Sequence, residues 1–428
     1  MNCCPRAKVQ RLLSAAGVIL PNGSRLPRSL IHINERGKIV DIVAESAANM
    51  SPAVDFEILD RRSCTLIPLL ADAHVHLAIS DGISESPAFH TQEMVDRQLS
   101  IYLRYGVGHV LSLGTDQRWL ETLAASRQER LAEGFATPYS AGTGFGARGG
   151  WPPELTVPET RYRPTDPNQA REKVRLLAKR GIRILKIWID DFAGNVAKMP
   201  VPTMCAIIEE AHHYGLKVLA HVFYLQDARD LVNAGIDGLA HSVRDQLVTS
   251  SFADQVSLKK VLLIPTLSRE EAASEFSRPE NAYLRDPFFQ SCCGGTISAL
   301  RELRSTTDDS QAAAFKKNLE IAMENLRTMH AAGVRICMGT DAGFQLKLPG
   351  FSQHRELTLM HQAGLSASEV LAAATGRNYE LFAPFASKLE RGQPADFCLL
   401  GGDPLDDLSQ TKNICEVWQN GIKIWPKE

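Results

Sequence analysis

The chain has 428 residues, of which 44% are hydrophobic and 22% are charged. This length and composition are typical of a globular protein with one large domain and a smaller one, and they exclude a disordered chain. The 47 basic and 49 acidic residues nearly balance, giving a formal net charge of −2, and no long block of one sign interrupts the sequence. We therefore expect a small-molecule substrate, with neither nucleic acid nor a membrane as a partner.

The cysteines and the first residues indicate the compartment. The nine cysteines form neither a CxxC motif nor a regular framework of spacings. Residues 1–20 (MNCCPRAKVQRLLSAAGVIL) combine basic residues with a short apolar stretch, but they contain no convincing signal-peptide cleavage site. No run approaches the ~20 apolar residues that a membrane-spanning helix needs. We therefore expect a reduced compartment and a cytoplasmic protein.

Strand patterns occupy both ends of the chain. Residues 1–66 alternate apolar and polar side chains in short runs, as in SLIHINERGKIVDIVAE, with a turn signal at Pro21-Asn22-Gly23. From residue 67 onward, short apolar runs alternate with segments of helical period, which predicts βα units around a parallel sheet. Strand patterns return in residues 386–428. We expect an α/β fold, with a (β/α)₈ TIM barrel over residues 67–385 and a small β-sandwich domain built from both termini.

A weak internal repeat supports the barrel. Five times a helical segment ends in glycine and an apolar strand follows, at Gly106, Gly181, Gly215, Gly235 and Gly333. A glycine just past a helix can take the left-handed conformation that closes the last turn. These glycines therefore predict where five helices end and the next strands begin.

The segment ADAHVHLAIS, residues 71–80, places two histidines one residue apart after an apolar run. Successive side chains on a strand point to opposite faces, so His74 and His76 are expected to project to the same side. That arrangement suits a metal chelate. Taken alone, the pair leaves open a second interpretation, in which one histidine packs locally and the other is solvated.

Four more side chains that can bind a metal follow the repeat glycines, at offsets of five, six, six and eight residues: Lys186, His221, His241 and Asp341. Each is expected at the carboxyl end of its strand, and in a (β/α)₈ barrel these ends form the rim where catalytic groups gather. Singly, each has an ordinary explanation; Asp341, for example, could cap the next helix. Together with the histidine pair, six candidates at one rim favour a functional site.

Seven motifs resemble the metal-dependent amidohydrolase superfamily, especially its imidazolonepropionase-like and prolidase-like branch: IPLLADAHVHL, LKIWIDD, GLKVLAHVF, GIDGLAHSV, MGTDAGF, LAAATGRNYELF and RGQPADFCLLGGDPLDD. The similarity runs from about residue 35 to residue 425. The resemblance implies a metal-dependent hydrolase that cleaves a C–N amide bond, in a peptide-like or N-acyl amino acid substrate.

The resemblance also implies two zinc ions per chain, held by six side chains: His74, His76, Lys186, His221, His241 and Asp341. The first histidine pair and Asp341 would bind one ion, and the two later histidines would bind the other. Lys186 matches a lysine that reacts with carbon dioxide to give a carbamate, whose two oxygens bridge the ions. An unmodified ammonium group has no lone pair and could not act as a ligand.

The implied nucleophile is a hydroxide that bridges both ions. Two divalent ions about 3.5–4 Å apart lower the pKa of a shared water and polarise a substrate carbonyl at the same time. Asp341 would accept the proton of the attacking hydroxide and deliver it to the leaving nitrogen, while His241 would hold the orientation of the site. Tyr224, three residues beyond His221, is a candidate for a hydrogen bond to the substrate, although packing alone would also explain an aromatic residue there.

Two departures from the superfamily pattern narrow the expected reaction. Tyr224 stands where deaminases of this superfamily commonly have a glutamate, which disfavours aromatic deamination. Lys186 disfavours the imidazolonepropionases proper, which use one metal. Two alternatives stay open: a hydrolase of cyclic amides or amidines, and a barrel that has lost catalysis and serves as a scaffold. By analogy with relatives, a homo-oligomer is expected.

Two long segments are expected on the catalytic face. Residues 140–154 (SAGTGFGARGGWPPE) are rich in glycine and follow the third predicted strand, which suggests a substrate loop or a simple connector. Residues 268–310 follow the seventh predicted strand and form the largest insertion. Because long insertions on this face are often lids or specificity elements, we expect this one to shape the pocket.

Overall fold

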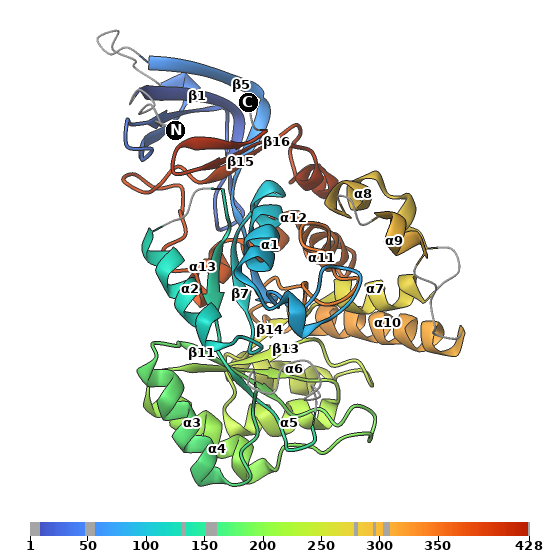
Figure 1. Cartoon of the computed structure of the whole chain (residues 1–428). Coiled ribbons are helices and arrows are strands. Elements are labelled where there is room, and N and C mark those ends of the chain that lie inside the picture. The colour runs from blue at the N-terminus through green and yellow to red at the C-terminus, as the bar shows by residue number, and fades with distance from the viewer. Residues whose placement is uncertain are drawn as a thin grey trace.

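The computed structural model describes residues 9–47, 56–130, 134–150, 161–277, 281–293, 297–302 and 309–426. A sheet made from both ends of the chain lies at one end of the molecule, at the top of Figure 1, with the N- and C-termini beside it. The helices and parallel strands of the middle of the chain extend away from this sheet. None of the described helices is both long enough and apolar enough to cross a bilayer.

Eight strands from the two ends of the chain form one hydrogen-bonded sheet: β1 (Gln10–Ile19), β2 (Arg25–Leu26), β3 (Ser29–Ile33), β4 (Ile39–Ala44), β5 (Phe56–Pro68), β15 (Phe397–Leu400), β16 (Ile414–Gln419) and β17 (Ile422–Trp425). The order is β17-β16-β15-β5-β1-β3-β4, with β2 paired to β1. Strands β1 and β5 are parallel, and the other pairs are antiparallel. The strand patterns predicted at the two ends of the chain therefore meet in one sheet.

The first predicted barrel strand is split between two sheets. Strand β5 runs past the predicted boundary after residue 66, because Ile67 and Pro68 pair with Cys398 and Phe397 of β15. After Leu69, the chain enters the next sheet as β6. One continuous segment thus connects the terminal sheet to the strand that carries the histidine pair.

Two further sheets contain only parallel strands. The first has three strands: β6 (Leu70–Val75), β7 (Val107–Ser112) and β8 (Thr137–Ser140). The second has the order β10-β9-β11-β12-β13-β14, and its strands are β9 (Gly144–Phe145), β10 (Arg161–Tyr162), β11 (Ile184–Trp188), β12 (Lys217–His221), β13 (Gly238–Ala240) and β14 (Leu262–Ile264).

The two parallel sheets are linked where the sequence predicts the last strand. Leu263 in β14 donates a hydrogen bond from its N–H to the carbonyl of Arg335 and accepts one from the N–H of Cys337. On the other side, Ala73 in β6 donates to the carbonyl of Met338. This linking segment, residues 335–342, forms only isolated bridges to its neighbours, so it bonds to both sheets without being a regular strand.

Helices follow most of the parallel strands, as the βα pattern predicts: α1 (Gln92–Arg104), α2 (Arg118–Arg130), α3 (Pro167–Lys179), α4 (Val201–His213), α5 (Leu225–Ala234), α6 (Ser250–Leu258), α7 (Leu267–Phe276), α8 (Pro287–Cys293), α9 (Ile297–Glu302), α10 (Asp309–Ala331), α11 (Phe351–Gln362), α12 (Ala367–Ala374) and α13 (Gly376–Leu381). The five glycines predicted to end helices all have positive φ, between 68° and 86°. Their predicted conformation is therefore confirmed.

The insertion after β14 is mainly helical. Its described part contains α7, α8 and α9 and a 3-10 turn at Tyr283–Arg285, and α7 packs against α10 and α11. Tyr283 and Phe289 of the insertion join Leu348 and Phe351 in one apolar cluster, which connects the insertion to the loop that follows Asp341. Residues 278–280, 294–296 and 303–308 lie outside the described residues, as does the end of the glycine-rich loop beyond residue 150.

Candidate metal centre

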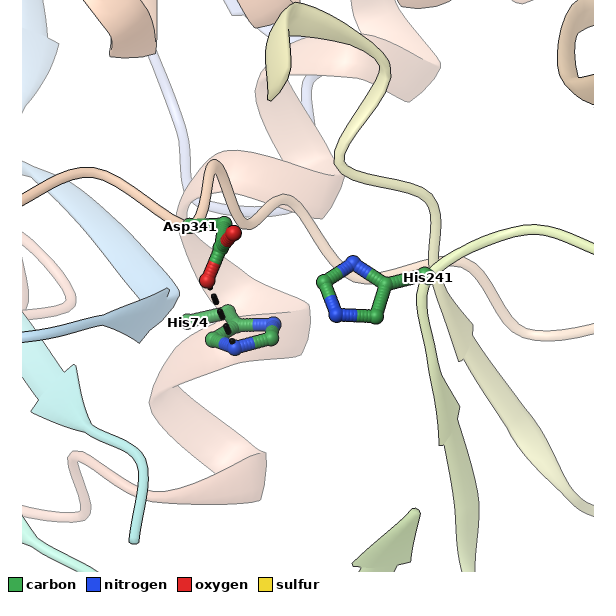
Figure 2. A group of neighbouring side chains, drawn as sticks. All are labelled: His74, His241 and Asp341. Carbon is green, nitrogen blue, oxygen red and sulfur yellow. Dashed lines mark ion pairs between the residues drawn. The ribbon is translucent and has the colours of Figure 1, made fainter. Parts of the chain in front are cut away.

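Four of the six predicted ligands lie at or just beyond the carboxyl ends of parallel strands: His74 in β6, His76 after it, His221 at the end of β12 and His241 after β13. Lys186 lies in the middle of β11, and Asp341 lies in the linking segment. All six are buried. Figure 2 shows the side chains of His74, His241 and Asp341 converging from three elements of the fold.

The carboxylate of Asp341 joins the first histidine pair. Its Oδ1 atom lies 3.3 Å from Nε2 of His74 and 3.0 Å from Nε2 of His76. One ligand atom each from His74, His241 and Asp341 lie within 4.8 Å of one another (Figure 2). This spacing suits three protein ligands around one metal ion.

His221 and Lys186 extend the group from two neighbouring strands. The ring centroids of His221 and His241 are 4.5 Å apart, and Nε2 of His221 lies 3.1 Å from Oδ2 of Asp190. The Nζ atom of Lys186 lies 3.4 Å from Nε2 of His74. The structure therefore brings the six predicted side chains into one cluster and adds Asp190 beside it.

The backbone around this cluster adopts conformations that are rare for non-glycine residues. His241 has φ 99° and Asp341 has φ 61°. Such strained positions gather at functional sites, where the surrounding structure holds them in place. Gly343, with φ 104°, lies so close to His76 that an added Cβ would be 1.7 Å from the carbonyl oxygen of His76. The loop after Asp341 can therefore approach the histidine pair only with glycine at this position.

Hydroxyl groups fix the orientation of two imidazoles. Thr266 donates its hydroxyl proton to the carbonyl of Pro265 at 2.8 Å, so its Oγ1 must accept the hydrogen bond that joins it to Nδ1 of His241 at 2.6 Å. The proton of His241 then resides on Nδ1, and its Nε2 carries a lone pair. On His76, Nδ1 lies 2.7 Å from Oγ1 of Thr115, so the opposite ring nitrogen, Nε2, is the one that faces Asp341.

Beneath the ligands, the buried carboxylate of Asp72 joins β6 to the linking segment. It accepts hydrogen bonds from the backbone N–H of His74 at 2.9 Å, from the hydroxyl of Thr340 at 2.6 Å and from the amide of Gln353 at 2.6 Å. Burial raises the pKa of Asp72 to about 7, although these hydrogen bonds oppose the rise. Asp72 thus fixes the relative position of the segments that carry His74 and Asp341.

Burial keeps the imidazoles neutral at ordinary pH. It lowers the pKa of His76 and His221 to about 4, and it lowers the pKa of His74 and His241 well below the usual value. Burial also lowers the pKa of Lys186 to about 7, although the charge of Asp341 opposes this shift. Four neutral imidazoles therefore offer lone pairs beside one carboxylate.

These residues fit a metal site. The Nδ1 atom of His74 is buried and has no hydrogen-bond partner among the residues that the structure describes, and its Nε2 faces the other ligands. Neutral imidazole nitrogens and carboxylate oxygens at strand ends are the ligands that zinc binds in catalytic sites. The imidazole nitrogens and the carboxylate oxygens of these described residues are therefore of the kind that would bind the metal ions implied by the sequence resemblance.

Tyr224 lies at the start of α5, half-buried beside the loop after β11. The ammonium of Lys198 lies 4.5 Å from the centroid of its ring. Burial and the nearby carboxylate of Asp191 raise the pKa of Tyr224 to about 12. In the described part of the chain, its side chain forms no hydrogen bond to any of the six ligands. A role in substrate binding stays a prediction.

The profile of the Amidohydrolase family matches residues 65–422, a span that includes all six predicted ligands. The chain belongs to the amidohydrolase family. Membership of this family supports a hydrolase that acts on C–N bonds with the help of metal ions. The resemblance noted in the sequence is therefore confirmed at the level of the superfamily.

This amidohydrolase is similar to the protein Rv2915c of Mycobacterium tuberculosis (strain ATCC 25618 / H37Rv), with 26% identity over 318 residues, or 72% of each chain. Among solved structures, it resembles a Xaa-Pro dipeptidase with bound methionine in the active site (TM-score 0.75, 20% identity, 97% of this chain and 99% of the other). It also resembles the ochratoxinase of A. niger (TM-score 0.72, 19%, 97% and 95%) and phenylurea hydrolase B (TM-score 0.73, 18%, 97% and 96%). These similarities show a TIM-barrel-type fold with an additional domain.

The groups that support the ligands were not among the residues predicted from the sequence. Asp190 could have been found, because it follows Lys186 in LKIWIDD at the same strand end as the other candidates. Asp72 could also have been found, because it precedes His74 by two positions and shares its face of the strand. Thr115 and Thr266 gave no signal, because their roles depend on loops that only the fold brings beside the histidines.

Thr115→Val is expected to weaken zinc binding by about 10- to 100-fold, because it removes the hydroxyl that orients His76 while keeping the side-chain shape. Competition with a chelating dye measures the affinity. The matched control is Thr122→Val on the exposed face of α2, where a threonine hydroxyl bonds the carbonyl of Arg118. Equal zinc affinities for the wild type and the Thr115 variant would contradict the orienting role.

Proposed function

We propose that this amidohydrolase is a binuclear zinc hydrolase that cleaves the C–N amide bond of a peptide-like or N-acyl amino acid substrate. The observation that carries the proposal is the convergence of six buried side chains: His74, His76, Lys186, His221, His241 and Asp341. When bound, two zinc ions would supply Lewis-acid chemistry by polarising a carbonyl oxygen and lowering the pKa of water. Hydrolysis adds one water across the amide bond and yields a carboxylic acid and an amine.

Lys186 is proposed to act as a carbamate. Its amine is completely buried and lies 3.4 Å from Nε2 of His74. Addition of carbon dioxide forms a bond between Nζ and carbon and releases one proton, which leaves a planar anion with two oxygens. That anion would offer one oxygen to the His74 side of the cluster and the other to the His221 side.

Asp341 is proposed to move the proton. Its Oδ1 atom faces the histidine pair, so this oxygen can accept a proton from attacking water and pass it to the leaving nitrogen. The other oxygen is held by Arg269 and Lys347, which keeps the carboxylate oriented. His241 would direct Nε2 toward the reacting groups, because Thr266 holds its Nδ1 atom.

We also propose that the two parallel sheets and the linking segment form the (β/α)₈ barrel predicted for residues 67–385, with residues 1–66 and 386–428 as the β-sandwich domain. The hydrogen bonds through Leu263 and Ala73 support this at one junction of the sheets. At the other junction, the N–H of Gly144 donates to the carbonyl of Gly114 at 2.8 Å.

The test combines metal analysis with a substrate panel of N-acyl amino acids, dipeptides and lactams. We expect close to two zinc ions per chain, hydrolysis of at least one linear amide, loss of activity on chelation, and recovery with zinc. His212→Ala is the control for adventitious binding, because His212 is partly exposed and pairs with Asp237 away from the cluster. Hydrolysis of lactams alone would favour the cyclic alternative. Little metal and no hydrolysis would favour the scaffold.

A further inference from the structure

We propose that Arg269 and Lys347 bind a carboxylate on the amine side of the substrate. The enzyme would then prefer N-acyl α-amino acids and dipeptides with a free carboxylate over neutral amides. This inference rests on the proposed hydrolysis of an amide bond and adds the group that selects the substrate.

Arg269 and Lys347 both contact a residue of the ligand cluster, and both side chains are partly exposed to solvent. Nε of Arg269 lies 3.2 Å and Nζ of Lys347 lies 3.1 Å from the same atom, Oδ2 of Asp341. Their side chains are 21% and 18% exposed, whereas that of Asp341 is 6% exposed. The cations therefore lie between the buried cluster and solvent, where an incoming substrate would meet them.

Local contacts hold Arg269 in place. It lies in the first turn of α7, and the buried carboxylate of Glu356 accepts hydrogen bonds from the backbone N–H groups of Leu267 and Ser268, at 2.9 Å and 2.7 Å. The same turn begins at Thr266, which orients His241. The position of Arg269 is therefore fixed relative to the ligands.

The ring of Phe344 contacts both Lys347 and His76 of the histidine pair. The ammonium of Lys347 lies 4.6 Å from the ring centroid of Phe344, and that centroid lies 4.4 Å from the ring centroid of His76. The two cations thus approach the cluster from different segments, one from the helix after β14 and one from the loop after Asp341. A pair placed in this way can hold an anion between its members.

Both cations have N–H donors that form no hydrogen bond within the described part of the chain. Nη1 of Arg269 donates to Glu270, Nε forms an ion pair with Oδ2 of Asp341, and Nη2 has no hydrogen-bond partner in the described part of the chain. Lys347 uses one of its three N–H donors on Asp341. Glu270 is also shared, because Nε of Arg244 lies 2.9 Å from its Oε1. Arginine and lysine side chains with unused donors are suited to a carboxylate.

The placement favours a carboxylate close to the scissile bond. Asp341 contacts the histidines through Oδ1 and the cations through Oδ2, so only one carboxylate group separates the two sets. In an N-acyl α-amino acid, the carboxylate is attached to the carbon next to the scissile nitrogen. An amide bond at the ligand cluster would therefore bring this carboxylate within reach of Arg269 and Lys347. A neutral anilide or urea has no group to place there.

The test uses three N-benzoyl amino acids (glycine, leucine and phenylalanine), each paired with its neutral carboxamide. Calorimetric binding and kcat/KM of the zinc-loaded enzyme are measured for the wild type, Arg269→Gln and Lys347→Met. Arg269→Lys and Lys347→Arg retain the charges. Arg175→Gln is the matched control, because Arg175 also pairs with a glutamate, Glu210, on the outer helices. The ratio of acid to carboxamide within each variant cancels partial loss of folded enzyme.

We expect the wild type and Arg175→Gln to bind at least one acid tenfold or more tightly than its carboxamide, with this preference lost in Arg269→Gln and Lys347→Met and retained in the charge-conserving variants. No preference for any acid in the wild type would overturn the inference, as would a preference that survives both neutralising variants. Acid-selective binding without hydrolysis of any compound would support the anion site and count against the proposed hydrolysis.

Discussion

Lys186→Ala is expected to bind one zinc ion per chain instead of two and to lose roughly 10³-fold in kcat/KM, since a second ion supplies several kcal/mol of transition-state stabilisation. The lysine is completely buried in the middle of β11 and lies 3.4 Å from Nε2 of His74. Alanine removes the amine that would carry the carbamate. Metal content by mass spectrometry and amide hydrolysis measure the two effects.

Because Lys186 is tightly packed, a second variant is needed to separate the loss of packing from the loss of the carbamate. A Cβ added at Gly114 would lie 2.5 Å from Cβ of Lys186, so the stem of the lysine fills a tight space. Lys186→Met keeps most of that volume but cannot form a carbamate, and it should lose the second zinc ion as the alanine variant does. Propionate should restore zinc binding only to Lys186→Ala, where the missing side chain leaves room for a carboxylate.

The control for Lys186 is Lys217→Ala, at the exposed start of the neighbouring strand β12, and it should keep both ions. Two zinc ions in Lys186→Ala would contradict the bridging role. Two zinc ions in Lys186→Met alone would show that the lysine contributes packing and not a ligand.

The regular part of the fold could be predicted from the sequence because periodicity and helix stops are local signals. The repeat glycines are left-handed, and strands begin after four of them. The linking segment was predicted as a regular strand but forms only isolated bridges, because its hydrogen bonds depend on both neighbouring sheets and not on its own apolar pattern. Strand β5 also ends two residues later than the predicted boundary after residue 66, because its pairing with β15 continues through Pro68.

Four of the ligands could be predicted because they follow helix-stop glycines by five to eight residues, and the histidine pair could be predicted because its alternate spacing suits a chelate. Asp72 and Asp190 stand in the same motifs as ligands, whereas Thr115 and Thr266 could not be predicted, because they come from loops distant in the sequence from the histidines that they contact. Arg269 and Lys347 both reach Asp341, yet neither shares a motif with it that a sequence pattern would reveal. Charge pairing in a folded site is a property of three-dimensional position, not of spacing along the chain.

Asp341→Asn is expected to keep zinc through the other five ligands, with weaker affinity, but to lose about 10²- to 10⁴-fold in kcat at saturating zinc, the usual contribution of a positioned acid or base. Lys347 donates a hydrogen bond to Oδ2 and Arg269 forms an ion pair with it, so the asparagine side chain should turn its carbonyl oxygen toward these cations. Its amide nitrogen would then occupy the place of Oδ1, facing the histidine pair, and could not accept a proton. Zinc content and turnover at saturating zinc separate the two functions of the residue.

Asp190→Asn is the matched control for Asp341→Asn, because it neutralises a second carboxylate beside the cluster, hydrogen-bonded to His221. It should change zinc affinity more than turnover at full occupancy. Asp341→Asn should add no backbone strain relative to the wild type. The φ of Asp341, 61°, lies in the left-handed region, which asparagine tolerates about as well as aspartate does. A loss of turnover would therefore reflect the missing carboxylate, whereas turnover within tenfold of the wild type would show that another group moves the proton.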